Sequence, residues 1–328
     1  MSAASEKVSL WKNRDYLLLW GGQTISNIGS SASRIAFPLL VLFITHSPIQ
    51  AGLLAAVSSV AYVALLLPAG AWLDRWPRKQ AMLYCDIGRA LCLLSIPIAV
   101  IINHITIVQL YIVGGLISVL EAFFEMAEIA SVPQVVAREH LPEAMGRMQV
   151  TFGIAQLIGP ILGGALFSYS HIAPFLLDTG SYVLSCCSLF FIRANFQQER
   201  QQLYTSHLGS EIVEGILHLW KQPLLRYMAV FTGCNVFFGS GYMLLLIILA
   251  QQRHASNAVI GLIFSGGGIG SIAGAAAASW LQQRYKFSQL IIASLWLVAL
   301  GWLLPLILSQ PMMLMLATGL INFCCSSL

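Results

Sequence analysis

Three carboxylates lie close together in a stretch of sequence that otherwise reads as lipid-soluble. The segment "EAFFEMAE", residues 121–128, contains Glu121, Glu125 and Glu128. At about 100° per helical residue, these side chains fall within about 60° of one another on one face of a helix. A charge near the centre of a bilayer costs at least about 2.5 kcal/mol on insertion scales, so such residues face a cavity, find a partner or stay protonated. The stripe therefore predicts a polar cavity whose carboxylates can exchange protons.

Depth in the membrane separates the three acids. The apolar run that contains them is expected to span residues 106–127, from the outside to the inside. Glu128 then lies near the cytoplasmic interface, where we expect an ordinary solvated acid. Glu121 lies about 10 residues, or roughly 15 Å, above the cytoplasmic end and close to mid-bilayer. Glu121 is therefore the first candidate for function and Glu125 is the second.

The elements that carry these acids are transmembrane helices. Hydrophobic residues make up 58% of the 328 residues, charged residues make up only 9%, and the mean hydropathy is +0.78. Apolar runs near 20 residues recur along the chain, which no soluble core requires. The sequence predicts an all-α polytopic membrane protein without a removable signal peptide. The ten expected spans are 16–44, 51–73, 82–102, 106–127, 150–169, 174–193, 226–250, 258–281, 288–309 and 311–328.

The basic residues predict the orientation of the chain. With the N-terminus inside, all of the 17 Lys and Arg residues except Arg34 and Arg253 fall on the cytoplasmic side. The expected location is the cytoplasmic (inner) membrane, with the N-terminus in the cytoplasm. The net charge of +4 is then a topology signal and indicates no nucleic-acid partner. The seven cysteines have no metal-type spacing, and no HExxH, paired Asp or Ser-His motif appears, so we expect no metal, no cofactor and no enzyme.

Polar and glycine landmarks recur at a nearly constant offset. Gly29-Ser30 matches Gly239-Ser240, 51–53 matches 260–262, and 72–74 matches 280–282, at offsets of 210, 209 and 208. This repeat predicts two homologous bundles, residues 1–193 and a partial second bundle, residues 226–328. The segment 194–225 is expected to be a cytoplasmic linker with an amphipathic helix, because Leu208, Ile212, Ile216 and Leu219 recur at helical spacing.

The most specific local pattern is "GAWLDRWPRKQ", residues 70–80, between the second and third spans. It resembles the loop signature of the major facilitator superfamily. The resemblance implies a cytoplasmic gate, in which Gly70 allows close helix approach and Asp74 meets a helix dipole or an Arg. An ordinary loop of the positive-inside type is the alternative explanation for the basic residues. The expected gate residues are Gly70, Asp74, Arg75, Arg78, Lys79, Asp86 and Arg89, of which Asp86 and Arg89 pair with each other or with the Arg75 loop.

A second pattern lies in the fifth span, "AQLIGPILGG", residues 155–164. It resembles the glycine and proline motif of exporters in the same superfamily, with Ala155 in place of the first glycine. Small residues allow close helix approach and proline bends a helix, so this segment is expected to be a pivot. Generic small-residue packing is the alternative. The expected pivot residues are Gly159, Pro160, Gly163 and Gly164.

Further segments resemble one branch of the superfamily, the enterobactin-type siderophore exporters and macrolide efflux proteins. They are "NRDYLLLW" (13–20), "IAFPLLV" (35–41), "DIGRA" (86–90) and "LLDTGSYVLS" (176–185). Asp178 in the last segment is expected to cap the outer boundary of the sixth span. The chain departs from the family in Pro77, which replaces a loop glycine, and in the absence of the Arg that many drug:proton antiporters carry in the fourth span.

The resemblance implies a fold of two six-helix bundles, whose spans 1, 4, 7 and 10 line a central cavity. Because the family has twelve spans and this sequence stops at Leu328 inside an apolar run, we expect an incomplete second bundle with about ten spans, as a fragment or a naturally truncated transporter. Arg34 would tune Glu121 or bind an anionic substrate group. A purely structural pair of Glu121 and Arg34 is the alternative.

The implied function is secondary active transport, with proton-driven efflux of small amphipathic molecules of the drug or siderophore class. An importer of the same fold and a non-transporting truncated remnant remain as alternatives. The expected partners are a small-molecule substrate, protons and the lipid bilayer, and the expected assembly state is a monomer.

Overall fold

The structure is a computed structural model in which the chain forms long helices. Helix α1 (Arg14–Thr45) is followed by α2 (Pro48–Leu73), α3 (Arg78–Ile101) and α4 (Ile107–Val135). A short 3-10 turn, η2 (Arg138–His140), leads into α5 (Leu141–Tyr169) and α6 (Ala173–Phe191). The second group contains α8 (Pro223–Gln252), α9 (Asn257–Arg284), α10 (Phe287–Ile307) and α11 (Leu314–Ser326). The structure describes residues 13–73, 76–136, 138–193, 217, 220–284, 287–307, 310 and 313–326.

Each expected span coincides with a helix, and the protein has the all-α polytopic architecture that the sequence predicts. In the described part of the chain, seven helices are long and apolar enough to cross a bilayer, and shorter apolar stretches lie at 241–252, 292–305 and 314–324. Helices suit this environment because they satisfy their backbone hydrogen bonds internally. The expected linker helix lies mostly outside the described residues.

The helix ends are set by capping residues, and three helices extend further than hydropathy predicts. The side chain of Asn13 accepts a hydrogen bond from the backbone N–H of Tyr16 at 3.1 Å, and Thr106 caps α4 in the same way. Helix α3 begins at Arg78 rather than at residue 82, α4 continues to Val135 rather than to 127, and α5 begins at Leu141 rather than at 150. Hydropathy falls at the first charged residues, whereas the helices continue beyond them.

Three of the described helices are followed by a residue with a left-handed backbone. His46 after α1, Asn103 after α3 and His254 after α8 have φ values of 51°, 54° and 56°. Among residues other than glycine, histidine and asparagine occupy this region more often than most. The His46 N–H donates to the carbonyl of Leu42 at 2.9 Å, which satisfies a free acceptor at the helix end.

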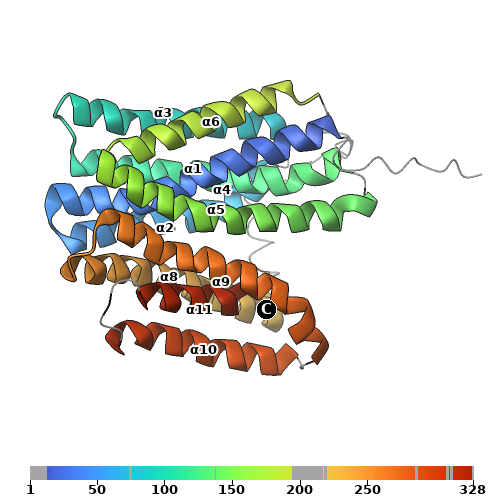
Figure 1. Ribbon diagram of the computed structural model, residues 1–328. Helices are drawn as coiled ribbons and strands as arrows, with labels where there is room; N and C mark the ends of the chain where they lie inside the picture. The colour runs from blue at the N-terminus through green and yellow to red at the C-terminus, as the bar shows by residue number, and fades with distance from the viewer. Residues whose placement is uncertain are drawn as a thin grey trace, which may run out of the picture.

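The helices form two groups that meet along α5 and α9 (Figure 1). In the first group α1 packs against α5 and α6, α3 packs between α4 and α6, and α2 packs against α4. In the second group α9 packs against α11, and α10 lies on the outer side of α11 (Figure 1). Helix α2 also contacts α8.

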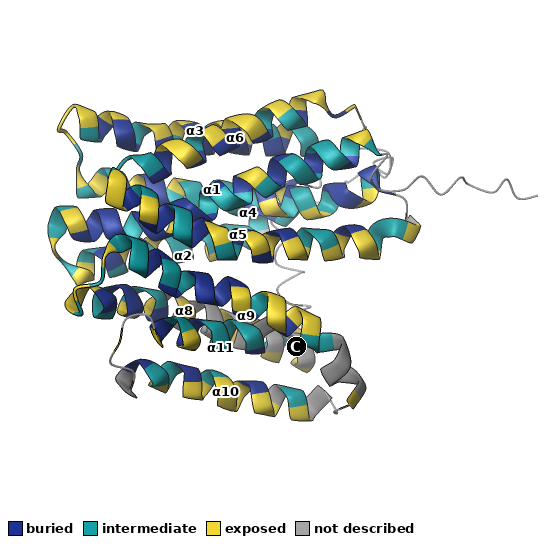
Figure 2. Ribbon diagram, viewed as in Figure 1, coloured by how far each residue is buried: buried dark blue, intermediate teal, exposed yellow. Residues whose placement is uncertain are grey.

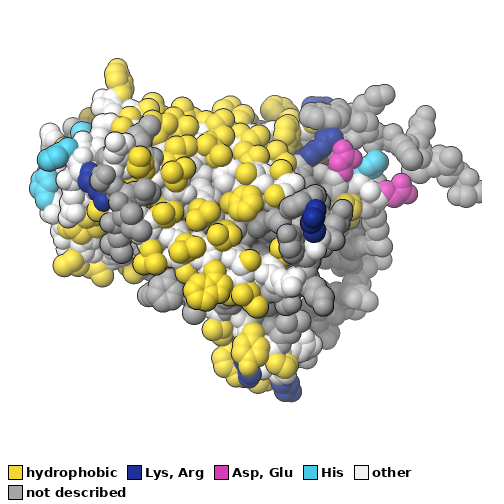
Figure 3. Space-filling view, turned by 60° about the horizontal axis from the view of Figure 1, so that its bottom comes forward, with side chains coloured by type: hydrophobic (Ala, Val, Ile, Leu, Met, Phe, Trp, Pro, Cys, Tyr) yellow, Lys and Arg dark blue, Asp and Glu magenta, His cyan; other side chains and the backbone are white. Residues whose placement is uncertain are grey.

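The outward faces of the helices are apolar. Large hydrophobic side chains such as Val60, Ile98 and Phe190 are exposed, and exposed positions follow the outer helices along their length (Figure 2). Hydrophobic side chains cover the middle of one face in the space-filling view (Figure 3). Apolar surface of this extent is typical of contact with lipid.

Candidate functional site

A large cavity lies between the two helix groups, with a volume of about 1260 Å³. Helices α1 to α6 of the first group line it, together with α8, α9, α10 and α11 of the second. Among the lining residues that the structure describes, the first group contributes four carboxylates and two guanidinium groups, and the second contributes uncharged side chains such as Ser294, Thr318 and Asn322.

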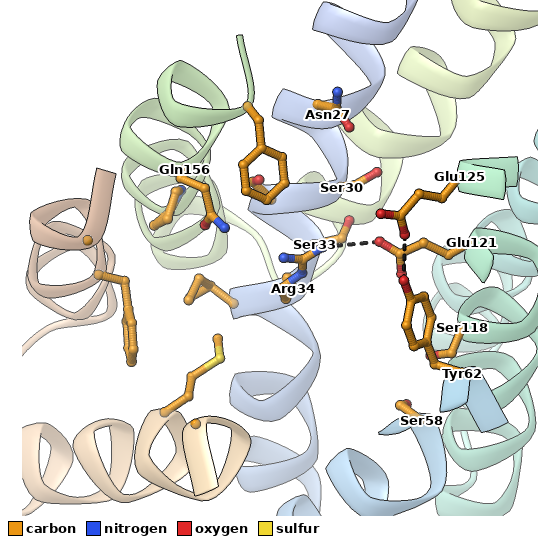
Figure 4. Close-up of a pocket in the computed structure, with 18 of the residues that line it drawn as sticks. Asn27, Ser30, Ser33, Arg34, Ser58, Tyr62, Ser118, Glu121, Glu125 and Gln156 are labelled. Carbon is orange, nitrogen blue, oxygen red and sulfur yellow. Dashed lines mark hydrogen bonds and ion pairs between the residues drawn. The ribbon is translucent and has the colours of Figure 1, made fainter. Parts of the chain in front are cut away.

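Glu121 and Arg34 form an ion pair across this cavity. The Nη2 atom of Arg34 on α1 donates to Oε1 of Glu121 on α4 at 3.1 Å (Figure 4). Glu121 is the middle residue of α4, which places its carboxylate far from either helix end. The side chains of Arg34 and Glu121 are 45% and 37% exposed. Because both line the cavity, water and solutes in it can reach the pair.

Glu125 lies one helical turn further along α4 than Glu121 and has its own partner. Its carboxylate accepts a hydrogen bond from the hydroxyl of Tyr62 on α2 (Figure 4). Ser58 and Ser118 lie on the same side of the cavity (Figure 4). Glu121 and Glu125 therefore both face the cavity. Glu121 is paired with the guanidinium group of Arg34, and Glu125 accepts a hydrogen bond from the phenol of Tyr62.

Glu128 is less exposed than an ordinary surface acid. Helix α4 continues for seven residues beyond it to Val135, which is about 10 Å of helix. Its side chain is partly buried and lines the cavity. The end of the apolar run is therefore not the end of the helix, and the position of Glu128 near the cytoplasmic interface stays a prediction.

Arg89 and Asp86 form a buried ion pair inside the first bundle. Arg89 Nη2 donates to Asp86 Oδ1, and the residues are 4% and 0% exposed. The carboxylate of Asp86 also accepts from Ser185 Oγ on α6 at 2.6 Å. The guanidinium lies over the rings of Phe124 and Tyr182, at 4.2 and 4.5 Å from their centroids.

This pair lies deeper in its helix than hydropathy suggests. Because α3 begins at Arg78 and not at residue 82, Arg89 lies near the middle of the helix. Among the described helices, α3 thus carries a basic residue far from its ends, as α1 does with Arg34. The expected pairing of Asp86 with Arg89 is present, and their part in a cytoplasmic gate stays a prediction.

The other expected gate residues are only partly described. Arg78 Nη1 donates to the carbonyl of Ala130 on α4 at 2.6 Å, and Lys79 Nζ donates to the carbonyl of Ile192 after α6 at 2.7 Å. These cations satisfy carbonyls near the C-terminal ends of neighbouring helices. A Cβ atom at Gly70 would meet nothing within 4 Å, so the expected close helix approach is absent there. Asp74 and Arg75 lie outside the described residues.

The glycines of the fifth span do make close helix contacts. A Cβ atom at Gly159 would lie 2.2 Å from Ser31 Cβ, and one at Gly163 would lie 2.4 Å from the carbonyl oxygen of Ala32, both on α1. A Cβ atom at Gly164 would lie 2.3 Å from a carbonyl oxygen of α9, that of Asn257. Helix α5 thus contacts α1 on one side and α9 on another.

Pro160 lies at the same junction of helices. It is buried inside α5, and its carbonyl oxygen would lie 2.2 Å from a Cβ atom at Gly261 of α9. The close contacts that the motif predicts are therefore present on both neighbours of α5, while a pivoting motion stays a prediction.

Asp178 is the functional candidate that sequence reasoning ranked too low. The N-cap of α6 is Ile172, and Asp178 lies beyond the first helical turn, so it does not cap the span as expected. It is 2% exposed and borders the cavity. Its neighbours on α1 include Ser30 and Ser33. The spacing of Ser26, Ser30 and Ser33, one face of α1, is the sequence signal for a polar partner.

The chemistry available to the cavity is proton exchange and the attraction of charged solutes. Within the described part of the chain, no group of three or more His, Cys, Asp or Glu side chains is arranged to hold a metal ion.

Comparison with known proteins gives one family. The family model of the Major Facilitator Superfamily matches residues 19–328. The chain is 26% identical over 236 residues to the multidrug efflux pump Tap of Mycolicibacterium fortuitum, which covers 67% of this chain and 55% of Tap. It is 24% identical over 276 residues to the enterobactin exporter EntS of Citrobacter koseri, which covers 82% of this chain and 64% of EntS.

The fold is also found among solved structures. A crystal structure of a mutant of the nucleoside transporter NupG superposes with a TM-score of 0.67 at 14% sequence identity, which covers 95% of this chain and 79% of that protein. The chain spans less than two thirds of the length of the curated relatives it matches.

Proposed function

Because this chain belongs to the major facilitator superfamily and has relatives in its efflux branch, we propose that it is a secondary active transporter that exports small amphipathic molecules in exchange for protons. The proposed substrates are of the drug or siderophore class. The proposed location is the cytoplasmic membrane, with the N-terminus inside, and the proposed assembly state is a monomer. The observation that carries this proposal is the ion pair of Arg34 and Glu121 in a solvent-accessible cavity at the middle of α4.

The geometry of this pair suits exchange of a proton for a substrate. When Glu121 is ionised, it holds Arg34 and so links α4 to α1 at 3.1 Å. When Glu121 takes up a proton, the ion pair is lost and Arg34 must find water or a substrate anion instead. A cationic substrate group competes with the proton for the same carboxylate. Competition of two ligands for one group makes the binding of each weaken the other, which is the requirement for antiport.

The rest of the cavity wall favours substrates with one charged end and one apolar end. The charges lie on the first bundle, and acidic groups outnumber basic ones there. The described wall of the second bundle offers apolar side chains such as Phe264, Leu295 and Ile321. Ligand sites of this kind hold the apolar part of a ligand by contact and orient it with few polar groups.

The helix contacts suggest which segments move during transport. Helix α5 lies against α1 and α9 with glycines at the contacts, so we assign the pivot to Gly159, Pro160, Gly163 and Gly164. Arg78 and Lys79 tie α3 to α4 and to the end of α6, which would let the first bundle move as one body. The gate role of Asp74, Arg75, Asp86 and Arg89 is part of the same proposal.

Transport in membrane vesicles tests the proposal. In everted vesicles energised with a proton gradient, a fluorescent lipophilic cation such as ethidium should accumulate, and its accumulation should release part of the gradient. Glu121→Gln should abolish the dependence on the gradient. Glu143→Gln is the matched control, because Glu143 lies in the first turn of α5 with Arg147 as its partner at 2.6 Å. An unchanged pH dependence in Glu121→Gln refutes the coupling role.

The direction of transport separates export from import. An exporter accumulates the dye in everted vesicles, whereas an importer accumulates its substrate in right-side-out vesicles. A protein that moves no tested solute in either preparation, while folded, would favour the non-transporting alternative.

A further inference from the structure

A second acidic site lies on α6, where Asp178 contacts α1. Ser33 and Arg34 are consecutive residues of α1. Arg34 reaches the ion pair with Glu121, whereas Ser33 is 3% exposed and faces Asp178 of α6. One helix therefore contacts both acids through neighbouring residues, and Figure 4 shows Ser30, Ser33 and Arg34 along α1.

The contacts of Asp178 are hydroxyl groups. Ser181 Oγ lies 3.2 Å from Asp178 Oδ1, Ser30 Oγ lies 3.4 Å from the same oxygen, and Ser33 is a third neighbour. Among the described residues, no Lys, Arg or His lies within ion-pair distance of Asp178. A buried carboxylate without a cation in contact depends on these hydroxyls for its stability.

The Ser181 hydroxyl has a nearer acceptor than the Asp178 carboxylate. Each hydroxyl carries one proton. Ser181 Oγ lies 2.7 Å from the Asp178 backbone carbonyl, closer than the carboxylate oxygen. Ser30 Oγ lies 2.8 Å from the Tyr182 hydroxyl, and either oxygen of that pair can donate, so Ser30 can direct its proton to Tyr182. A protonated carboxyl group fits this geometry, because its own O–H can donate to a serine oxygen.

The charges that act on Asp178 can be named for each neighbouring helix. On α3 the charge is Arg89, whose guanidinium lies over Tyr182, and its partner Asp86 contacts α6 through Ser185. On α4 the charge is Glu121, which acts at longer range. From α1 the groups that contact Asp178 are the hydroxyls of Ser30 and Ser33, and the described ionisable residues of α5 lie near its ends.

We propose that Asp178 is a second proton-binding group, which exchanges its proton with the cavity past Ser30 and reports its state to Glu121 through α1. This inference rests on the proposed proton-coupled function. The proton comes from water in the cavity and forms an O–H bond on a carboxylate oxygen of Asp178, and ionisation returns it to water. Asp178, Ser30 and Tyr182 all border the cavity, which gives the proton a path of hydroxyl groups.

The backbone of α1 is close enough to sense the change. A Cβ atom at Gly29 would lie 2.8 Å from Asp178 Oδ1 and 2.4 Å from Ser181 Oγ. When Asp178 gains a proton, its carboxyl group exchanges hydrogen-bond acceptors for a donor. Because this group lies against the α1 main chain at Gly29, the change alters a contact of α1. The same helix carries Arg34 to Glu121, so the two acids are coupled through one rigid element.

Infrared difference spectroscopy of the purified full chain in lipid tests this proposal without any substrate. A shift from alkaline to acidic pH should produce carbonyl bands of protonated carboxyl groups, one of which comes from Asp178 and another from Glu121. Asp178→Asn should remove the first of these two bands, and Glu121→Gln should remove the second. Glu143→Gln is the control and should leave both of them in place. An Asp178→Asn spectrum identical to that of the unchanged protein in this region overturns the proposal.

A second pair of variants covers the case in which Asp178→Asn does not fold. Ser33→Ala and Ser181→Ala each remove one hydroxyl neighbour and should shift the frequency of the Asp178 band while the Glu121 band stays fixed. An unshifted band in both variants overturns the proposal. The vesicle assay is read separately. If every variant keeps its proton coupling, the proposed function is refuted, but the infrared bands of Asp178 and Glu121 can still be observed.

Discussion

The ion pair of Arg34 and Glu121 should contribute little to stability and much to transport. The structural alternative, in which the pair only holds α1 to α4, predicts the reverse. Arg34→Gln, Glu121→Gln and the double variant form a thermodynamic cycle that isolates the pairwise interaction from the effect of each side chain alone. The same variants can be placed in the vesicle assay.

The expected magnitude follows from the exposure of the two side chains. Breaking a buried pair by removing one partner costs about 3–5 kcal/mol, because a charge is left uncompensated. Pairs in contact with solvent couple by about 0.2–1 kcal/mol. Arg34 and Glu121 are 45% and 37% exposed, and both border the cavity, so the second range applies. We expect a coupling free energy of about 1 kcal/mol or less, which is about a fivefold change in the unfolding equilibrium.

Equilibrium unfolding in mixed micelles, followed by tryptophan fluorescence, gives the four free energies of the cycle. A coupling of about 3 kcal/mol or more, together with unchanged pH dependence of transport in Glu121→Gln, would refute the reasoning. That combination would mean that the cavity is dry around the pair and that its role is structural.

Two further predictions concern the packing of the first bundle. Gly163→Leu should destabilise the protein by about 1–3 kcal/mol, because its Cβ would lie 2.4 Å from the backbone oxygen of Ala32. Gly180→Ala, with nothing within 4 Å of the added Cβ, is the control for thermal unfolding, and equal losses in the two variants would contradict the assignment. Arg89→Met should cost about 3–5 kcal/mol, since it leaves Asp86 buried and unpaired. Adding Asp86→Asn should recover part of that loss, and no recovery would show that lost packing, not charge, is responsible.

Much of the fold follows from the sequence because lipid restricts the choices. A bilayer requires helices of about 20 apolar residues, so composition and the spacing of apolar runs identify the spans before any contact is known. The pairing of Glu121 with Arg34 could also be predicted from the sequence. Both residues are charged and lie inside apolar runs, where few partners of opposite charge are available. The glycines of α5 were recognisable from their spacing.

What the sequence could not reveal depends on where helices end and which neighbours they meet. Glu128 appeared to lie at the end of its helix because hydropathy falls after residue 127, yet α4 is helical to Val135. Arg89 appeared to lie near a loop for the same reason, at the other end of a span. The environment of Asp178 requires knowing that α1 lies against α6, which no local pattern specifies. Gly70 shows the converse, since a motif glycine makes no close contact in this structure.

The left-handed turns at His46, Asn103 and His254 bear on how the chain passes from one helix to the next. His46 is the C-cap of α1, and Asn103 and His254 each come one residue after the C-caps of α3 and α8. Asparagine and histidine tolerate this conformation better than most residues with a Cβ atom, so these helices end without a glycine. The next helix begins at Pro48, Ile107 and Asn257, respectively. A left-handed residue at the helix end thus lets the chain reverse direction within a few residues, which keeps the connections between these helices short.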